Sequence, residues 1–400
     1  MKIFKLIKKC FTKKSRIYTF KVLFIFFLLN INIIIFYFIE FHQLIVFEKA
    51  IEKKFKENNH VNLNKIESEI IFGIQNSFWI SKFFFRRKVE KFINYSNEIN
   101  IGLSLDKDYI LKAMITTASI IYSQKSTTKL RLHFSVVLDF KSKDMIKIYS
   151  LRNRMRNDVE FNFYNASRVE KELNSISNKG PGLAAKLLLP QLVDDNVERL
   201  IILDCGDLLV LRDLSEMYNW NMNNNMYMGS PDPSAGVFGK ISNKTLNIYI
   251  NAGNYLIDVK KVKNKNMYNL FLKYKDVYGP PFAEQMMIND IASGEVGYMP
   301  LEFGIVPAFS NDAFYFNQTE KSIYTYYNLS IISEKSNFLP KNFEEFYQSV
   351  YNPVIVHSWY GKWSQGNGMN IYRKLCQFFI ELSGIKDEIC KKFPGYCIKV

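Results

Sequence analysis

The sequence predicts an α/β fold with a mainly parallel sheet that helices cover on both faces. From residue 99 onward, short apolar runs typical of buried strands alternate with segments whose apolar residues recur at helical spacing. Strands that alternate with helices favour parallel pairing, because the helix carries the chain back across the sheet. With 400 residues, of which 48% are hydrophobic, the chain is long and apolar enough to bury such a core.

Positive charge is concentrated at the N-terminus. The first 21 residues contain eight Lys and Arg residues and no acid, which is more than half of the net charge of +15. A nucleic-acid-binding domain would instead gather its positive charge on one folded face. We therefore expect a basic tail over residues 1–21 and no nucleic-acid partner.

Residues 22–39 form an uncharged run that is long enough to cross a membrane. At about 1.5 Å per residue, the run just spans a hydrocarbon core of about 30 Å. It is long for a signal peptide, and no small-x-small cleavage site follows it, so an uncleaved signal-anchor is expected. The cations before the run place the tail in the cytoplasm, which predicts a single-pass type II membrane protein with residues 40–96 as a lumenal stem.

The C-terminal residues 367–400 are expected to form a helix and a cysteine-containing tail. On the lumenal side of a membrane, disulfides can persist. Cys390 and Cys397 enclose a short Pro-Gly turn, which indicates a disulfide between them. Pairing of Cys376 with either one is the alternative, and the sequence does not choose.

The folded part opens with strands and a helix. Ile99–Leu105 alternates apolar with small or polar residues, which is typical of a strand, and Ile110–Tyr122 has apolar residues at helical spacing. Two more strands are expected at Leu130–Leu138 and Asp158–Tyr164. In parallel sheets, ligands bind outside the carboxyl ends of the strands, so the Leu105–Tyr109 segment is a candidate binding loop.

Two carboxylates interrupt the next apolar segment. Leu200–Leu203 is typical of a strand buried on both faces, Asp204 and Asp207 follow it, and the apolar run resumes at Leu208. Burying a neutral polar group without a hydrogen bond costs about 2–7 kcal/mol, and burying an unpaired charge costs more. Two buried carboxylates therefore need compensation. A divalent cation such as Mg²⁺ or Mn²⁺ would compensate both. The alternative is that one of the two acids merely ends a strand and caps the next element.

Two further polar positions lie in apolar surroundings. Lys186 is the only charge in the helical segment 183–193, where it either contacts an anionic ligand or extends to the surface. Asn251-Ala252-Gly253 precedes the strand-like residues 254–259. Its small residues allow a ligand to approach the backbone closely, although a β-bulge is the alternative.

Two polar positions complete the ordered set of motifs. Gln285, within Glu284-Gln285-Met286-Met287-Ile288-Asn289, begins a helical segment and alone would be read as part of a helix cap. His357 follows the strand-like residues 353–356 and is followed by Gly361 and Lys362. A single histidine at a strand end is most often an ordinary polar residue, so these two positions gain meaning only from the whole order.

Taken in order, these motifs resemble glycosyltransferase family 8 over about residues 97–366. The order is specific, whereas no one motif is. The resemblance implies a GT-A fold, which is Rossmann-like with a mainly parallel sheet. It also implies Mn²⁺- or Mg²⁺-dependent transfer of a sugar from a UDP-sugar, with retention at the anomeric carbon.

The resemblance also implies which residues hold the nucleotide-sugar donor. The nucleoside would contact Leu103, Ser104, Leu105 and Tyr109, with the Tyr109 ring stacked on the uracil. The diphosphate would contact Lys186, Gly361 and Lys362, and Lys362 would stabilise the charge on UDP as it leaves.

The metal would be held by Asp204, Asp207 and His357. Here the chain departs from the family's Asp-x-Asp, because Gly206 stands in the place of the second Asp and Asp207 follows it. The sequence leaves open whether Asp207 or the backbone near Gly206 completes the metal shell.

Catalysis would involve Asn251, Gln285 and Lys362, with Gln285 near the anomeric carbon. The implied function is transfer of glucose, galactose or xylose to a glycan or glycoprotein in the Golgi or endoplasmic reticulum, with the catalytic domain in the lumen. The alternative is a catalytically inactive lumenal protein that binds sugars or nucleotide-sugars.

Overall fold

The computed structural model describes residues 98–138, 143–177, 180–232, 248–277, 283–305, 353–357 and 371–397. All of them belong to one compact unit, residues 93–400. The predicted tail, anchor and stem, as well as Gly361 and Lys362, lie outside the described residues. Within the described ranges, no helix has the length and apolar character needed to cross a membrane.

The described strands form a seven-stranded sheet in the order β3-β2-β1-β4-β7-β6-β8. Only β7 runs against its neighbours β4 and β6, and the other pairings are parallel, which confirms the predicted mainly parallel sheet. Its strands are β1 (Glu98–Asp106), β2 (Lys129–Val137), β3 (Glu160–Asn165), β4 (Arg199–Leu203), β6 (Tyr227–Pro231), β7 (Ile250–Asp258) and β8 (Val296–Tyr298).

A second, two-stranded sheet pairs β5 (Leu208–Val210) with β9 (Ile355–His357) in antiparallel register. Leu208 lies opposite His357. The apolar sequence after Asp207 therefore does not continue β4 but forms a strand of its own. The loop between β4 and β5 lies where the two sheets meet, which brings His357 to it.

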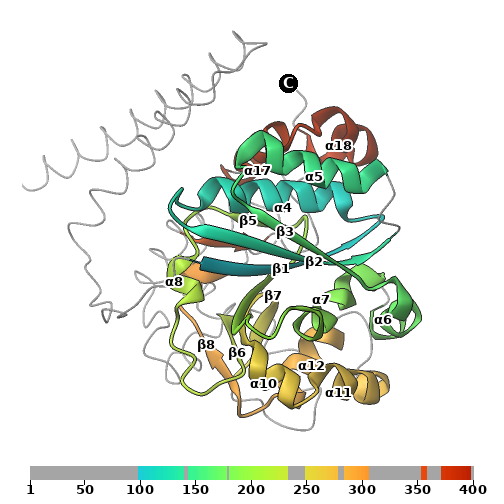
Figure 1. Cartoon of the computed structure of the whole chain (residues 1–400), viewed down its shortest axis with the longest axis vertical. Helices are drawn as coiled ribbons and strands as arrows, with labels where there is room; N and C mark the ends of the chain where they lie inside the picture. The colour runs from blue at the N-terminus through green and yellow to red at the C-terminus, as the bar shows by residue number, and fades with distance from the viewer. Residues whose placement is uncertain are drawn as a thin grey trace, which may run out of the picture. The chain divides into compact units, whose positions relative to one another are not determined.

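Helices cover both faces of the large sheet (Figure 1). One face carries α4 (Ile110–Ser123), α5 (Lys143–Met155), α17 (Ile371–Ser383) and α18 (Lys386–Lys392). The other carries α6 (Glu170–Ile176), α7 (Pro181–Leu192), α10 (Val259–Asn264), α11 (Met267–Tyr274) and α12 (Ala283–Ile291). A short helix, α8 (Ser215–Tyr218), follows β5. Since β1 is covered on both sides, all of its residues after Glu98 are buried and it shows no inside–outside alternation.

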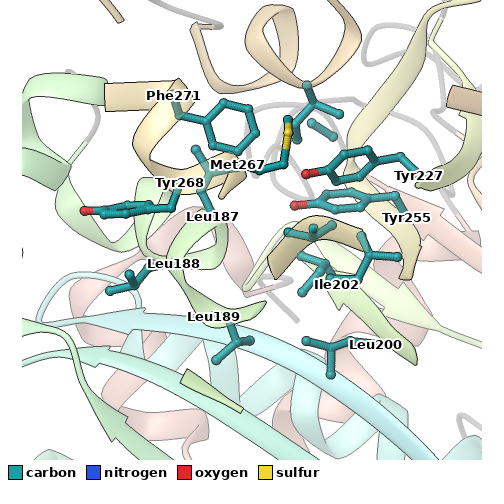
Figure 2. Packing of buried hydrophobic residues seen from close by; sticks show 14 of the residues in the cluster. Leu187, Leu188, Leu189, Leu200, Ile202, Tyr227, Tyr255, Met267, Tyr268 and Phe271 are labelled. Atoms are coloured by element: carbon teal, nitrogen blue, oxygen red, sulfur yellow. The ribbon is translucent and has the colours of Figure 1, made fainter. Parts of the chain in front are cut away.

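Apolar side chains of α7 pack against the large sheet beside the site (Figure 2). Leu189 of α7 faces Leu200 and lies near Ile202 of β4. A Cβ on Gly102 of β1 would lie 2.5 Å from Leu189 Cδ2, so only glycine allows α7 to approach this closely. Helix α7 begins with Pro181, whose fixed φ suits the first turn of a helix. This tight packing fixes the position of the polar Lys186 on the same helix.

Candidate active site

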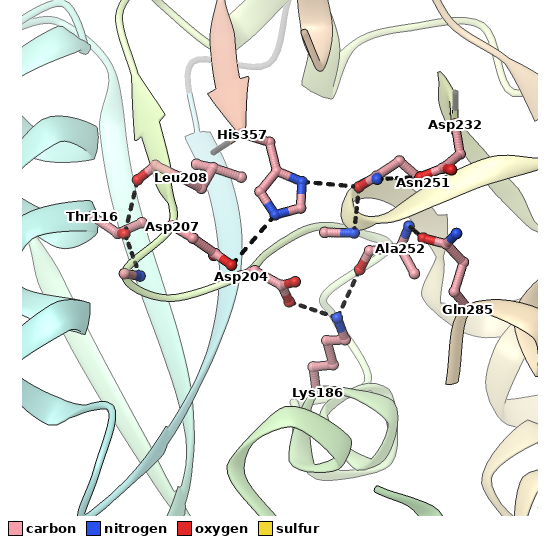
Figure 3. A network of polar contacts seen from close by, with 12 residues as sticks. Thr116, Lys186, Asp204, Asp207, Leu208, Asp232, Asn251, Ala252, Gln285 and His357 are labelled. Carbon is pink, nitrogen blue, oxygen red and sulfur yellow. Dashed lines mark hydrogen bonds and ion pairs between the residues drawn. The ribbon is translucent and has the colours of Figure 1, made fainter. Parts of the chain in front are cut away.

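Asp204, Asp207 and His357 lie together where the two sheets meet (Figure 3). One ligand atom from each lies within 4.8 Å of the other two, and His357 Nε2 is 3.6 Å from Asp207 Oδ2. The two acids come from the loop after β4, and the histidine is the last residue of β9. The structure thus brings together the three expected metal ligands from distant parts of the chain.

The donor set fits a divalent cation. Two carboxylates and one imidazole are ligands that Mn²⁺ and related ions accept. Asp207 Oδ1 is buried, and among the described residues it has no hydrogen-bond partner, which is costly unless something else compensates it. Burial alone would lower the pKa of His357, but the Asp207 and Asp204 carboxylates raise it above its ordinary value. The same negative field would attract a cation.

The hydrogen bonds of Asn251 determine which nitrogen of His357 faces Asp207. Asn251 donates from Nδ2 to Asp232 Oδ2 (2.5 Å), and its Oδ1 accepts from the Gly253 amide (2.7 Å), so the amide orientation is set. His357 Nδ1 lies 3.1 Å from that same Oδ1, which can only accept, so Nδ1 carries the proton. In the neutral ring, Nε2 then keeps its lone pair on the side of Asp207, as a metal ligand requires.

Lys186 binds Asp204, the first residue of the loop Asp204–Asp207, which is called the metal loop below. Its side chain is buried, and Nζ donates to Asp204 Oδ1 (2.5 Å) and to the Ala252 carbonyl (2.7 Å). Burial alone would lower the pKa of Lys186, but Asp204 and then Glu284 raise it, so the ammonium is charged at neutral pH. We expected Lys186 to contact the donor; in the structure its contacts are with the metal loop and β7.

The expected nucleoside-binding residues divide into two groups. Leu103, Ser104 and Leu105 are buried in the central strand β1, and the two leucine side chains are part of the core. Tyr109, just before α4, is half-buried beside the metal loop. Burial, followed by the Asp207 and Asp204 carboxylates, raises its pKa. Of this set, Tyr109 is the residue that is not fully buried.

Asp106 connects the end of β1 to the start of α7, a role that the sequence analysis missed. Its Oδ1 accepts from the backbone amides of Asp108 (2.9 Å) and Tyr109 (3.0 Å), and its Oδ2 accepts from that of Gly182 (3.0 Å). A Cβ on Gly182 would collide with this carboxylate. An Asp at a strand end before a turn was the available signal, because such residues close Asx turns.

Hydroxyl groups on α4 hold the other side of the metal loop, and these were also missed. Thr116 Oγ1 accepts from the Gly206 amide (2.9 Å) and donates to the Leu208 carbonyl (2.9 Å). Ser119 Oγ accepts from the Val210 amide (3.0 Å). Hydroxyls three residues apart in an apolar helix were the signal, since that spacing places them on one face.

Two amide side chains of α12 bind the backbone at the start of β7. Gln285 Oε1 accepts from the Ala252 amide (2.9 Å), and Asn289 bonds both the amide (2.8 Å) and the carbonyl (2.9 Å) of Ile250. The Asn251-Ala252-Gly253 motif therefore lies within a strand and not before one. A Cβ on Gly253 would lie 2.6 Å from His357 Nδ1, so the histidine needs a glycine there.

The sequence profile of "Glycosyl transferase family 8" matches residues 100–332, more than half of the chain. The chain belongs to glycosyltransferase family 8. No curated protein matches it in a sequence search.

Solved structures share the GT-A-like fold of this family 8 chain. The apo structure of the bifunctional glycosyltransferase WbbM is 18% identical with a TM-score of 0.55, covering 75% of this chain and 52% of WbbM. This chain thus spans about half of WbbM. An active-site mutant of LgtC is 17% identical with a TM-score of 0.52, covering 72% of this chain and 95% of LgtC.

The departure from the family 8 Asp-x-Asp motif is accommodated by Gly206. This residue has a φ of +92°, a left-handed conformation that glycine adopts without strain. Its amide is bound to Thr116, and its carbonyl accepts from Tyr396 OH (3.2 Å). The Asp207 carboxylate faces His357. Asp207 is therefore better placed than the Gly206 backbone to complete the ligand set.

Proposed function

We propose that this chain is a retaining, divalent-cation-dependent glycosyltransferase that moves a hexose or pentose from a UDP-sugar to a glycan or glycoprotein. The observation that carries the proposal is the grouping of Asp204, Asp207 and His357 in a chain of family 8. One buried oxygen of this group has no hydrogen-bond partner among the described residues. Mn²⁺ or Mg²⁺ is the expected ion, because both accept carboxylate oxygens.

The proposed donor is a nucleotide-sugar. A structure described as galactosyltransferase LgtC in complex with donor and acceptor sugar analogs has a TM-score of 0.50 with this chain at 17% identity. The half-buried Tyr109 offers an aromatic face to a base beside the metal loop. Glucose, galactose and xylose remain equal candidates for the transferred sugar.

In the proposed reaction, the acceptor hydroxyl oxygen bonds to the anomeric carbon on the face from which the phosphate departs. The bond from that carbon to the β-phosphate oxygen breaks, and the hydroxyl proton passes to the leaving phosphate, which gives UDP. A bound divalent cation would stabilise negative charge on the diphosphate. No pair of carboxylates is needed as nucleophile and acid.

The chain's own residues position the reacting groups. Lys186 and Asn251 fix two of the metal ligands, Asp204 and His357. Gln285 fixes the backbone of β7 at Ala252, next to the Gly253 position against which the His357 ring packs. Lys362, outside the described residues, is proposed to stabilise the leaving UDP.

We further propose a single-pass type II location in the Golgi or endoplasmic reticulum, with the catalytic domain in the lumen. The basic tail and the uncharged run 22–39 support this topology. The Cys390–Cys397 disulfide suits an oxidising compartment. Protease protection in sealed microsomes tests it: the domain should be protected until detergent is added, and cleavage without detergent would contradict the topology.

The direct test of activity uses the full-length chain in mild detergent with UDP-glucose, UDP-galactose and UDP-xylose. We expect Mn²⁺-dependent release of UDP from at least one donor, loss on chelation, and recovery when Mn²⁺ is restored. Asp207→Asn should abolish the release. Asp195→Asn, at a carboxylate whose side chain is 97% exposed, is the matched control. Release that persists after chelation would contradict the proposal.

A further inference from the structure

The C-terminal segment Cys390–Cys397 contacts the metal loop, although the family match ends at residue 332. We expected residues 367–400 to lie outside the catalytic domain. In the structure, the Cys390–Cys397 disulfide closes a segment that contains the end of α18 and the turn Pro394–Tyr396, whereas Cys376 is buried and takes no part in this disulfide. Helices α17 and α18 lie on the same face of the sheet as α4 (Figure 1).

Tyr396 connects this segment to Gly206, 190 positions away in sequence. Tyr396 is 5% exposed, and its hydroxyl donates to the Gly206 carbonyl over 3.2 Å. Thr116 holds the amide of the same residue. The left-handed residue between the two acidic ligands is thus held at both its amide and its carbonyl, by elements distant in sequence.

Lys112 of α4 forms a second connection. Its ammonium lies 5.0 Å from the Tyr109 ring centroid, 4.5 Å from that of Phe393 and 6.0 Å from that of Tyr396. Among the described residues it makes no hydrogen bond or ion pair, so the three rings are its contacts there. A Cβ on Gly206 would lie 3.0 Å from Lys112 Cδ, which shows that the Lys112 stem lies directly against the loop.

We propose that Tyr396 and Lys112 are positioning residues that hold the Asp204–Asp207 loop in its metal-binding conformation, and that the Cys390–Cys397 disulfide keeps Tyr396 in place. The hydrogen bond and the cation–π contacts favour the one loop geometry in which Asp207 faces His357. Without them, a cation must order the loop as it binds, which weakens its affinity. The expected change in Mn²⁺ affinity rests on the proposed function, whereas the expected change in the order of the loop does not.

The test compares Tyr396→Phe with Tyr218→Phe in the full-length protein. Both variants lose one phenol hydroxyl that donates to a backbone carbonyl, at 3.2 Å for Tyr396 and 3.3 Å for Tyr218, but only Tyr396 contacts the metal loop. Hydrogen–deuterium exchange of peptides over residues 203–210 is measured without metal, and Mn²⁺ affinity is measured by titration calorimetry. Thermal unfolding shows whether both variants are folded.

Tyr396→Phe should raise exchange in the loop and weaken Mn²⁺ binding by about fivefold, the effect of one neutral hydrogen bond, while Tyr218→Phe changes neither. Equal loop exchange and equal Mn²⁺ affinity in the two variants would overturn the proposal. If no variant and no wild-type protein binds Mn²⁺, the proposed function fails, and loop exchange alone still decides the inference.

Further variants test the Cys390–Cys397 disulfide and Lys112. Replacing both Cys390 and Cys397 with serine should increase loop exchange at least as much as Tyr396→Phe. Unchanged exchange would show that the disulfide does not hold Tyr396 in place. Lys112→Gln should weaken Mn²⁺ binding more than Lys112→Arg, because arginine keeps the cation over the rings. Equal affinities of the two Lys112 variants would show that the cation plays no part.

Discussion

Replacement of Lys186 by methionine should destabilise the metal-free protein strongly. Methionine keeps most of the apolar stem but leaves the Asp204 carboxylate and the Ala252 carbonyl without their donor. Removing one partner of a buried ion pair costs roughly 3–5 kcal/mol. The Lys186 side chain is 0% exposed and that of Asp204 is 14% exposed, so partial solvation of the carboxylate favours the lower end, about 3 kcal/mol.

The assay is denaturant unfolding of the full-length chain in detergent with chelator, followed by tryptophan fluorescence. Lys263→Met is the control, because its partner Asp195 is 97% exposed and such a surface pair contributes about 0–1 kcal/mol. In the Asp204→Asn background, Lys186→Met should cost much less, since no charge is left unpaired. Mn²⁺ should restore part of the loss in Lys186→Met alone, because a cation also compensates Asp204.

Two results would contradict the expected coupling between Lys186 and Asp204. Equal losses for Lys186→Met and Lys263→Met would mean that burial of the pair has no energetic consequence. An unchanged cost of Lys186→Met in the Asp204→Asn background would mean that the two residues are not coupled.

Three further predictions concern residues around the site and the sheet. Asn251→Leu should weaken Mn²⁺ binding roughly 10- to 100-fold by releasing the His357 ring; calorimetry measures this, and unchanged affinity would contradict the assigned tautomer. Thr116→Val removes two hydrogen bonds to the loop and should cost roughly 1–3 kcal/mol in unfolding free energy; no loss would show that the loop does not depend on α4. Burial lowers the pKa of His133 from 6.5 to about 4, so wild type should lose stability between pH 6.5 and 4, by about 3 kcal/mol, because only the unfolded chain gains that proton. His133→Gln should flatten that part of the pH profile, and an unchanged slope would contradict the assignment.

Single strands and helices, and the acidic loop at Asp204 and Asp207, could be predicted from local sequence patterns. The apolar runs located β1, α4, β2 and β4 to within about two residues. Asp204 and Asp207 could be singled out because buried charge needs compensation, whatever the fold. The parallel sheet followed from the alternation of strands and helices.

Pairings between distant segments could not be predicted from the sequence. Nothing in the sequence around Leu208 indicates that it leaves the main sheet to pair with residue 357, and the resemblance alone brought His357 to the metal site. The partner of Lys186 could not be predicted either, because an apolar helix with one lysine is compatible with a ligand or with a buried carboxylate. The role of Tyr396 was not predicted, because its partner is the backbone carbonyl of Gly206, 190 positions away, and a backbone partner leaves no signal in the sequence.

Asp204, Asp207 and His357 are proposed to hold one divalent cation. This proposal is tested most directly by titrating Mn²⁺ into the full-length chain and following the free ion by electron paramagnetic resonance. We predict a single saturable site in the wild-type protein, loss of that site in Asp207→Asn, and its retention in Asp195→Asn. Equal Mn²⁺ binding by wild type and Asp207→Asn would show that these three residues do not form the cation site.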